Sequence, residues 1–210
     1  MPSYYDFHIK RVNETLKLVN PYIKGINDIL NIGYSDFDEY IKDYFNRDIS
    51  YLIPESMLDN KIKNNKFIIG DICDPNFKTY NRYDLVIFTE VLEHLLQDDE
   101  IVMMNIKKLV RPGGLLLISV PNALTFSNRF KVLIGKNIYW SKKDIIKGVY
   151  GGYGHIREYS ASEIKELVGK FFNILNVRGI NGYRNGIKKI LNILPYTYSN
   201  TIAILGENNE

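Results

Sequence analysis

The sequence predicts an α/β fold with a mainly parallel sheet that is covered by helices on both faces. Short apolar runs alternate with helical stretches along the chain up to residue 122. Most of these runs are apolar throughout instead of alternating with polar residues, which is typical of strands buried on both faces. None approaches the length of a membrane span, since even LLLISV (115–120) is only a few residues long.

The chain begins with a predicted amphipathic helix over residues 8–19, where Ile9, Val12, Leu16 and Val19 recur at helical spacing. The motif RPGG (111–114) predicts a turn between a helix and the strand that follows it. Residues 123–155 fit no strand and predict a cap or loop over the sheet edge. In chain order, the predicted strands are 28–33, 49–54, 66–71, 83–88, 115–122, 172–180 and 200–206, and the further helices are 36–45, one opening in TEVLEHL (89–95), 98–110, 160–172 with Ser160 as its cap, and 187–194.

Length and composition favour a single domain over residues 1–210 in a reducing compartment, which we expect to be the cytoplasm. The one cysteine, Cys73, excludes an internal disulfide, and the first residues show no secretory pattern. The net charge of +3 is too small to indicate nucleic acid. From residue 121 onward, however, 13 Lys/Arg against 6 Asp/Glu give a net charge of +7, which could attract a phosphate-bearing acceptor or be a solvated surface.

Polar side chains follow several predicted strands at the points where the strands end. Gly33 follows the first strand, Asp71 the third and Thr89 and Glu90 the fourth. Because ligands of open α/β sheets bind at the carboxyl ends of the strands, we expect these groups to converge on one site. A glycine turn and nearby acids suit an adenosine-type ligand.

The segment TEVLEHL holds two carboxylates and an imidazole within five positions. On a helix, Glu90, Glu93 and His94 would share one face, because their spacing is i, i+3, i+4. Three interpretations are open: acids at an ordinary helix start, a histidine base, or a metal site.

Four segments in this order and spacing resemble class I S-adenosylmethionine-dependent methyltransferases over nearly the whole chain. The resemblance implies a Rossmann-like three-layer sandwich. Its sheet would have seven strands in the order 3-2-1-4-5-7-6, mostly parallel with one antiparallel strand, and its cofactor would be S-adenosylmethionine. The segments are FIIGDICD (67–74), YDLVIFTEVLEHL (83–95), LVRPGGLLLISVPN (109–122) and GHIREYSASEIKELV (154–168).

The resemblance also implies a set of cofactor-binding residues, although the first motif departs from the family pattern. Asn31 stands in place of the usual acid, and Ser35 and Phe37 stand where further glycines are expected. The chain is therefore either an enzyme with an altered cofactor loop or a catalytically inactive binding module. A nucleotide-dependent oxidoreductase is disfavoured because G-x-G-x-x-G is absent. The implied cofactor residues are Asn31, Gly33, Glu55, Asp71, Ile72 and Glu90.

For the acceptor side, the E-x-x-E-H run and the later His155 resemble O-methyltransferases of ubiquinone biosynthesis. This resemblance implies His94 and His155 as catalytic residues, with Glu93 orienting them. Alternatively, Glu90, Glu93, His94 and His155 would bind Mg, Mn or Zn, as in RNA 2′-O-methyltransferases.

Residues 122–160 resemble methyltransferases of glycan assembly, which implies O-methylation of a glycan or another small molecule. Nucleic acid is the less favoured acceptor, and His8 is expected to be incidental. The residues proposed to contact the acceptor are Arg129, Lys131 and Arg157 for a phosphate and Tyr139, Trp140, Tyr150 and Tyr153 for stacking.

Overall fold

A seven-stranded sheet organises the chain in the computed structural model, which describes residues 4–57, 66–139, 143, 154–181 and 194–210. The strand order is β3-β2-β1-β4-β5-β7-β6, with β1 to β5 parallel and β7 antiparallel to both of its neighbours. The predicted fold class and strand order are therefore confirmed. The strands are β1 (Ile29–Ile32), β2 (Ile49–Ile53), β3 (Lys66–Ile69), β4 (Tyr83–Thr89), β5 (Val110–Pro121), β6 (Asn173–Ile180) and β7 (Thr201–Glu207).

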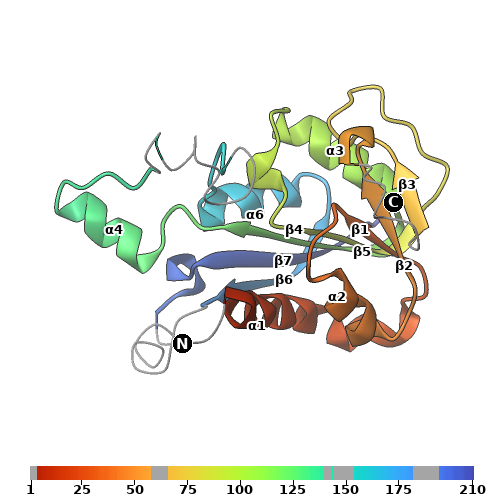
Figure 1. Ribbon diagram of the computed structural model, residues 1–210, viewed down its shortest axis with the longest axis horizontal. Helices are drawn as coiled ribbons and strands as arrows, with labels where there is room; N and C mark the ends of the chain where they lie inside the picture. Colours follow the sequence, from red (N-terminus) through yellow and green to blue (C-terminus); the bar gives the residue numbers. More distant parts are fainter. Residues whose placement is uncertain (1–3, 58–65, 140–142, 144–153, 182–193) are drawn as a thin grey trace.

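Helices cover both faces of the sheet, as Figure 1 shows. On one face lie α1 (Tyr4–Leu16) and α2 (Asp38–Phe45), and on the other lie α3 (Asp99–Leu109) and α6 (Ala161–Gly169). Successive side chains of a strand point to opposite faces, so Ile29 packs into the core beneath α1 and α2, while Leu30 packs into the core beneath α3 and α6. The strands are mainly apolar because each contributes to both cores.

Helix boundaries follow the expected capping chemistry. Asp98 caps α3 by accepting a hydrogen bond from the Glu100 N–H at 2.8 Å. Ser160 and Glu163 form a reciprocal capping box at the start of α6, which confirms the predicted serine cap. The predicted N-terminal helix is α1, continued by a 3₁₀ helix, η1 (Lys17–Gly25). Shorter 3₁₀ turns are η2 (Glu55–Met57), η3 (Leu92–His94) and η4 (Tyr196–Tyr198).

The motif RPGG lies within the bounds of β5, but the chain still turns there: Gly113 has a φ of 72°, and the pairing with β4 shifts register between Val110 and Leu115. The main chain there pairs with the C-terminal segment: the Gly113 N–H donates to the Asn208 carbonyl, and the Asn208 N–H donates to the Gly114 carbonyl. Arg111 is anchored by ion pairs with Asp28 at 2.6 Å and Asp84 at 2.5 Å. These contacts hold the irregular segment in place within β5.

The predicted helix in TEVLEHL is wrong, since only the three residues of η3 are helical. Glu90 has a φ of 56°, in the left-handed region, and Leu95 is extended. Glu90, Glu93 and His94 therefore do not share the face of one α-helix. The chain turns sharply at Glu90, whose N–H still donates to the Ser119 carbonyl of the neighbouring strand.

Part of the predicted cap over residues 123–155 is described. It contains α4 (Phe126–Leu133), which projects beyond the end of the sheet, away from the other labelled helices (Figure 1). The predicted helix 187–194 lies, apart from its last residue, outside the described residues. In the part of the chain that the structure describes, no helix is both long enough and apolar enough to cross a membrane.

Candidate functional site

A cavity of about 550 Å³ lies at the carboxyl edge of the sheet, where β1 and β4 end. Its volume is that of an ordinary small-molecule site. Tyr34 and Phe37 line the cavity without filling it, and 47% of the Tyr34 side chain remains exposed. The lining residues are Arg11, Val12, Thr15, Leu16, Asn31, Ile32, Gly33, Tyr34, Ser35, Phe37, Ile41, Met57, Thr89, Glu90, Val91, His94, Leu95 and Ser119.

The loop after β1 is shaped by an acid that the sequence reasoning missed, Asp38. Its carboxylate accepts hydrogen bonds from the Asn31 Nδ2 at 2.8 Å and from the Ser35 N–H at 2.7 Å. Gly33 has a φ of 94°, which L-residues rarely adopt, and this bends the loop around the cavity. Burial raises the pKa of Asp38 to about 7, against the opposing effect of its two hydrogen bonds. An acid therefore contacts position 31 from the first turn of α2, although Asp38 itself does not line the cavity.

The cavity contains a paired positive and negative charge. Arg11, on α1, forms an ion pair with Glu90, and the Ser119 Oγ donates to the same carboxylate at 2.8 Å. Both charged side chains are largely covered, with exposed fractions of 21% and 17%. The sequence offered no signal for Arg11 beyond its place on an amphipathic helix.

The predicted residues Glu55, Asp71 and Ile72 do not belong to the cavity lining. Glu55 is exposed on η2. Asp71 is exposed as well, accepts a hydrogen bond from the Cys73 N–H and lines a separate cavity of about 220 Å³. Ile72 is buried and its carbonyl accepts from Asn105. Asn31, Gly33 and Glu90, in contrast, all line the large cavity.

Two histidines meet at one side of the cavity. His94 lines it, and the ring of His155 stands edge-on to that of His94, with centroids 5.1 Å apart. The His94 Nδ1 lies 2.9 Å from the Gly154 carbonyl oxygen, which can only accept, so Nδ1 carries the proton and Nε2 is the basic nitrogen of the neutral ring. Burial lowers the pKa of His94, which favours this neutral form.

Glu93 lies beside the two histidines and is only 1% exposed. Neither of its carboxyl oxygens has a hydrogen-bond partner among the described residues. Burial, followed by the nearby charge of Glu90, raises the pKa of Glu93 to about 9. One ligand atom each from Glu93, His94 and His155 lie within 4.8 Å of one another, a grouping to which Glu90 does not belong.

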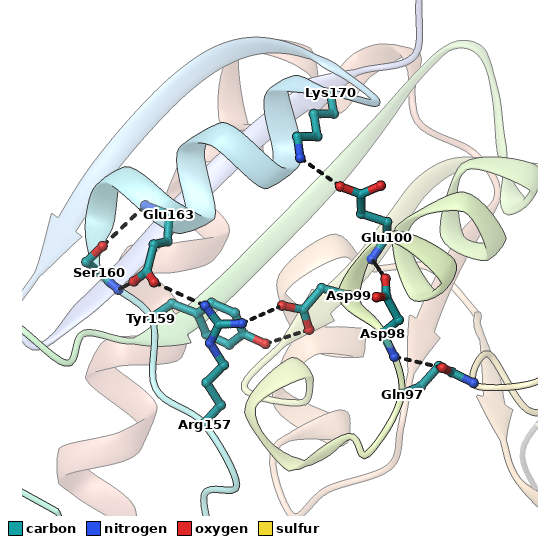
Figure 2. A network of polar contacts seen from close by, with 9 residues as sticks. All are labelled: Gln97, Asp98, Asp99, Glu100, Arg157, Tyr159, Ser160, Glu163 and Lys170. Atoms are coloured by element: carbon teal, nitrogen blue, oxygen red, sulfur yellow. Dashed lines mark hydrogen bonds and ion pairs between the residues drawn. The ribbon is translucent and has the colours of Figure 1, made fainter.

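The segment carrying His155 is anchored to the rest of the fold by a polar network. Figure 2 shows the Arg157 guanidinium between the carboxylates of Asp99 and Glu163, at 3.4 and 3.1 Å, while the Tyr159 hydroxyl donates to Asp99 at 2.8 Å. The Ile156 N–H also donates to the Glu93 carbonyl at 2.8 Å. Arg157, proposed above to meet a phosphate, is therefore engaged in positioning this segment.

The other proposed acceptor contacts are dispersed. Arg129 stacks on the Tyr198 ring at 4.2 Å, whereas Lys131 and Tyr139 are exposed. His8, expected to be incidental, packs against Phe37 of the cavity wall, with ring centroids 6.0 Å apart. Trp140, Tyr150 and Tyr153 lie outside the described residues.

Comparison with known proteins agrees with this geometry. A family model described as a methyltransferase domain matches residues 22–171. No curated protein matches the chain. Among solved structures, the N-methyltransferase NodS from Bradyrhizobium japonicum, with S-adenosyl-L-homocysteine, aligns over 97% of this chain and 88% of its own, with a TM-score of 0.60 and 16% identity.

Two further structures show the same fold. A methyltransferase from Thermotoga maritima, described as a possible histamine N-methyltransferase, has a TM-score of 0.63 at 15% identity and covers 99% of this chain and 93% of its own. The plantazolicin methyltransferase BpumL, in complex with a triazolic desmethylPZN analog and S-adenosyl-L-homocysteine, has a TM-score of 0.58 at 18% identity and covers 96% of this chain and 85% of its own.

The chain belongs to the methyltransferase-domain family, within the class I S-adenosylmethionine-dependent superfamily. The residues present fit this cofactor. The cavity is large enough, its loop bends at a glycine, and the charges of Arg11 and Glu90 complement the carboxylate and ammonium of an amino-acid moiety. The altered first motif has not closed the site.

Proposed function

We propose that this protein methylates a hydroxyl oxygen on a small-molecule or glycan acceptor. The observation that carries the proposal is the histidine pair beside the cavity, with the His94 Nδ1 fixed by the Gly154 carbonyl. A hydroxyl must lose its proton as the oxygen is methylated, whereas a neutral amine can attack without a base. A neutral imidazole at this position supports transfer to oxygen.

S-adenosylmethionine, when bound, supplies the electrophilic methyl group. Arg11 and Glu90 would hold its charged amino-acid end, and Asn31 and Gly33 would form the wall against which it lies. Phe37, Ile41, Met57 and Leu95 contribute apolar walls that exclude water. The remaining predicted residues, Glu55, Asp71 and Ile72, would join the site only if their segments shift on binding.

The His94 Nε2 would accept the hydroxyl proton. His155 would keep that ring in orientation and electrostatically disfavour its protonation before the acceptor arrives. Most of the remaining rate acceleration would come from alignment of the two substrates. For a phosphate-bearing acceptor, Lys131 is the most accessible of the three proposed basic residues, because it is exposed and makes one long hydrogen bond, to Asn128 at 3.3 Å, whereas Arg129 and Arg157 each make several contacts.

The test is a panel of hydroxyl acceptors and their amine analogues, incubated with the purified protein and S-adenosylmethionine and analysed by mass spectrometry. We expect a methyl group on hydroxyl acceptors. His94→Gln should lower kcat for them by about 10²–10⁴-fold while sparing amine methylation. His155→Gln, outside the cavity lining, should leave affinity for S-adenosylhomocysteine unchanged. Methylation of amines alone would contradict the proposal.

A second candidate is a metal-dependent enzyme, including a 2′-O-methyltransferase acting on RNA. It is supported by the grouping of Glu93, His94 and His155, and by the buried Glu93 carboxyl with no hydrogen-bond partner among the described residues. Mixed carboxylate and imidazole ligands suit Mn, Mg or Zn. The Nδ1 contacts of His94 with Gly154 and of His155 with Glu158 resemble the outer contacts that orient metal-binding histidines.

Chelation separates the two candidates. The protein is treated with a chelator, assayed with the hydroxyl panel and with RNA ending in a 2′-hydroxyl or 2′-deoxy nucleotide, and then supplied with Mn²⁺. The metal candidate predicts activity that requires Mn²⁺ and that His155→Ala abolishes. Activity indifferent to chelation would leave His94 as an ordinary base.

A further inference from the structure

Helix α4 presents an apolar face that nothing in the described chain covers. None of its residues is buried. The exposed fractions are 48% for Phe126, 56% for Phe130, 81% for Leu133 and 49% for Ile134 at the end of the helix. Their spacing, i, i+4, i+7 and i+8, places all four on one side of the helix. Bulky apolar side chains gathered in this way usually mark an interaction surface.

The opposite side of α4 is fastened to the protein, so the apolar face is held outward. The Asn128 Nδ2 donates to the Ala123 carbonyl at 2.9 Å. The Arg129 Nε donates to the Leu124 carbonyl at 2.9 Å, and its guanidinium lies on the Tyr198 ring. Thr125 caps the first turn. Figure 1 shows the helix extending past the sheet, where a flat surface could reach it.

The charges around α4 are of one sign. Residues 122–139 contain Arg129, Lys131 and Lys136 and no Asp or Glu. Lys131, on the helix, and Lys136, just beyond its end, are both exposed. A helix with aromatic and aliphatic residues on one side and lysines beside them is suited to the interface of an anionic bilayer.

We propose that α4 docks this protein onto anionic lipid membranes, with Phe126, Phe130 and Leu133 inserted among the lipids and Lys131 and Lys136 at the headgroups. A second copy of the chain would fit less well, because two such surfaces would bring like charges together. The helix follows β5, whose Ser119 lines the cavity, so docking would hold the active-site edge near the bilayer.

The test is co-sedimentation of the full chain with phosphatidylcholine vesicles, with or without about 30% phosphatidylglycerol. We expect binding to the anionic vesicles that weakens with salt. The double variant Phe130→Ser with Leu133→Ser should lower the partition coefficient by about tenfold or more. The control is Tyr80→Ser with Leu96→Ser, which removes two other exposed apolar side chains (100% and 89% exposed) and should bind normally.

Charge is tested in the same assay. Lys131→Glu with Lys136→Glu should lower binding by about tenfold, whereas Lys78→Glu with Lys165→Glu makes the same change of net charge elsewhere and should not. If circular dichroism shows that the serine variant is misfolded, the assay is repeated with Phe130→Gln and Leu133→Gln, because glutamine has a higher helix propensity than serine. No binding to anionic vesicles, or equal binding by the α4 variants, would overturn the proposal. So would light scattering that shows a dimer which the α4 variants dissociate.

Discussion

Replacement of Asp38 by asparagine is expected to change how the stability of this protein depends on pH. Asp38 is 3% exposed, and burial raises its pKa to about 7, from an ordinary value of 3.8. The ionised form is therefore disfavoured in the folded protein relative to the unfolded chain. This contribution to stability is greatest below about pH 4 and is lost as the pH rises through about 7.

The magnitude follows from the two pKa values. Their difference corresponds to a loss of about 4 kcal/mol in the free energy of unfolding between low and high pH. About 3 kcal/mol of that loss falls between about pH 5 and pH 8.5. The asparagine in the variant does not titrate, and its side-chain oxygen can still accept from the Ser35 N–H, while Asn31 can turn its amide to keep the second hydrogen bond.

The assay is urea unfolding of wild type and Asp38→Asn across this pH range. The variant should be similar to or slightly less stable than wild type near pH 5 and should gain about 3 kcal/mol relative to it by pH 8.5. Other titrating groups are common to both proteins and cancel in the comparison. Parallel stability curves would show that Asp38 does not carry a raised pKa, and the assigned burial of its charge would be refuted.

Three further changes have expected outcomes. Arg11→Ala should raise the Kd for S-adenosylhomocysteine about tenfold by calorimetry, because it removes a charged partner from the cavity; an unchanged Kd, as expected for the control Arg47→Ala, would exclude Arg11 from the site. Gly33→Ala should lower the free energy of unfolding by about 1 kcal/mol or more, because a φ of 94° strains any residue with a side chain. The added Cβ itself would fit, since its nearest neighbour, Val91, lies at 3.5 Å. A melting temperature equal to that of wild type would contradict this expectation. Ser160→Ala should remove the capping box of α6 and lower the melting temperature by about 2–4 °C, whereas the exposed Ser56→Ala should have no effect.

The fold could be predicted because its determinants are local and repeated. Each strand buries both faces, so the run YDLVIF, which is apolar apart from Asp84, stands out from the flanking polar residues. Ser160 and Glu163 predict the start of α6, because they form a capping box at its first turn. The error in TEVLEHL arose where a distant contact overrides local preference: the chain is bent at Glu90, whose N–H donates to the Ser119 carbonyl of β5.

The candidate site could be predicted only in part, because some of its residues are brought together by contacts between distant parts of the chain. Gly33 and His94 lie next to strand ends, so the sheet rule indicates them. Arg11 lies 79 positions before its partner Glu90, and nothing in its neighbourhood distinguishes it from other surface arginines. Asp38 lies seven positions after Asn31, among other acids of the same helix, and its role becomes visible only when the loop is folded.

The contacts of Arg11 and Asp38 together explain how a strand-one loop with one glycine can border an open cavity. In a glycine-rich loop the backbone itself can approach a ligand closely, but Ser35 and Phe37 carry Cβ atoms that prevent such an approach here. The loop is instead held by the carboxylate of Asp38, which accepts hydrogen bonds from Asn31 and from the Ser35 N–H, while both residues still line the cavity. We therefore expect side chains to contact the ligand, since Arg11 of α1 forms an ion pair with Glu90 in the cavity lining. If this expectation is correct, restoring glycine at position 35 or 37 should strengthen cofactor binding little, whereas loss of Arg11 should weaken it clearly. The opposite ranking in calorimetry would return the binding role to the backbone.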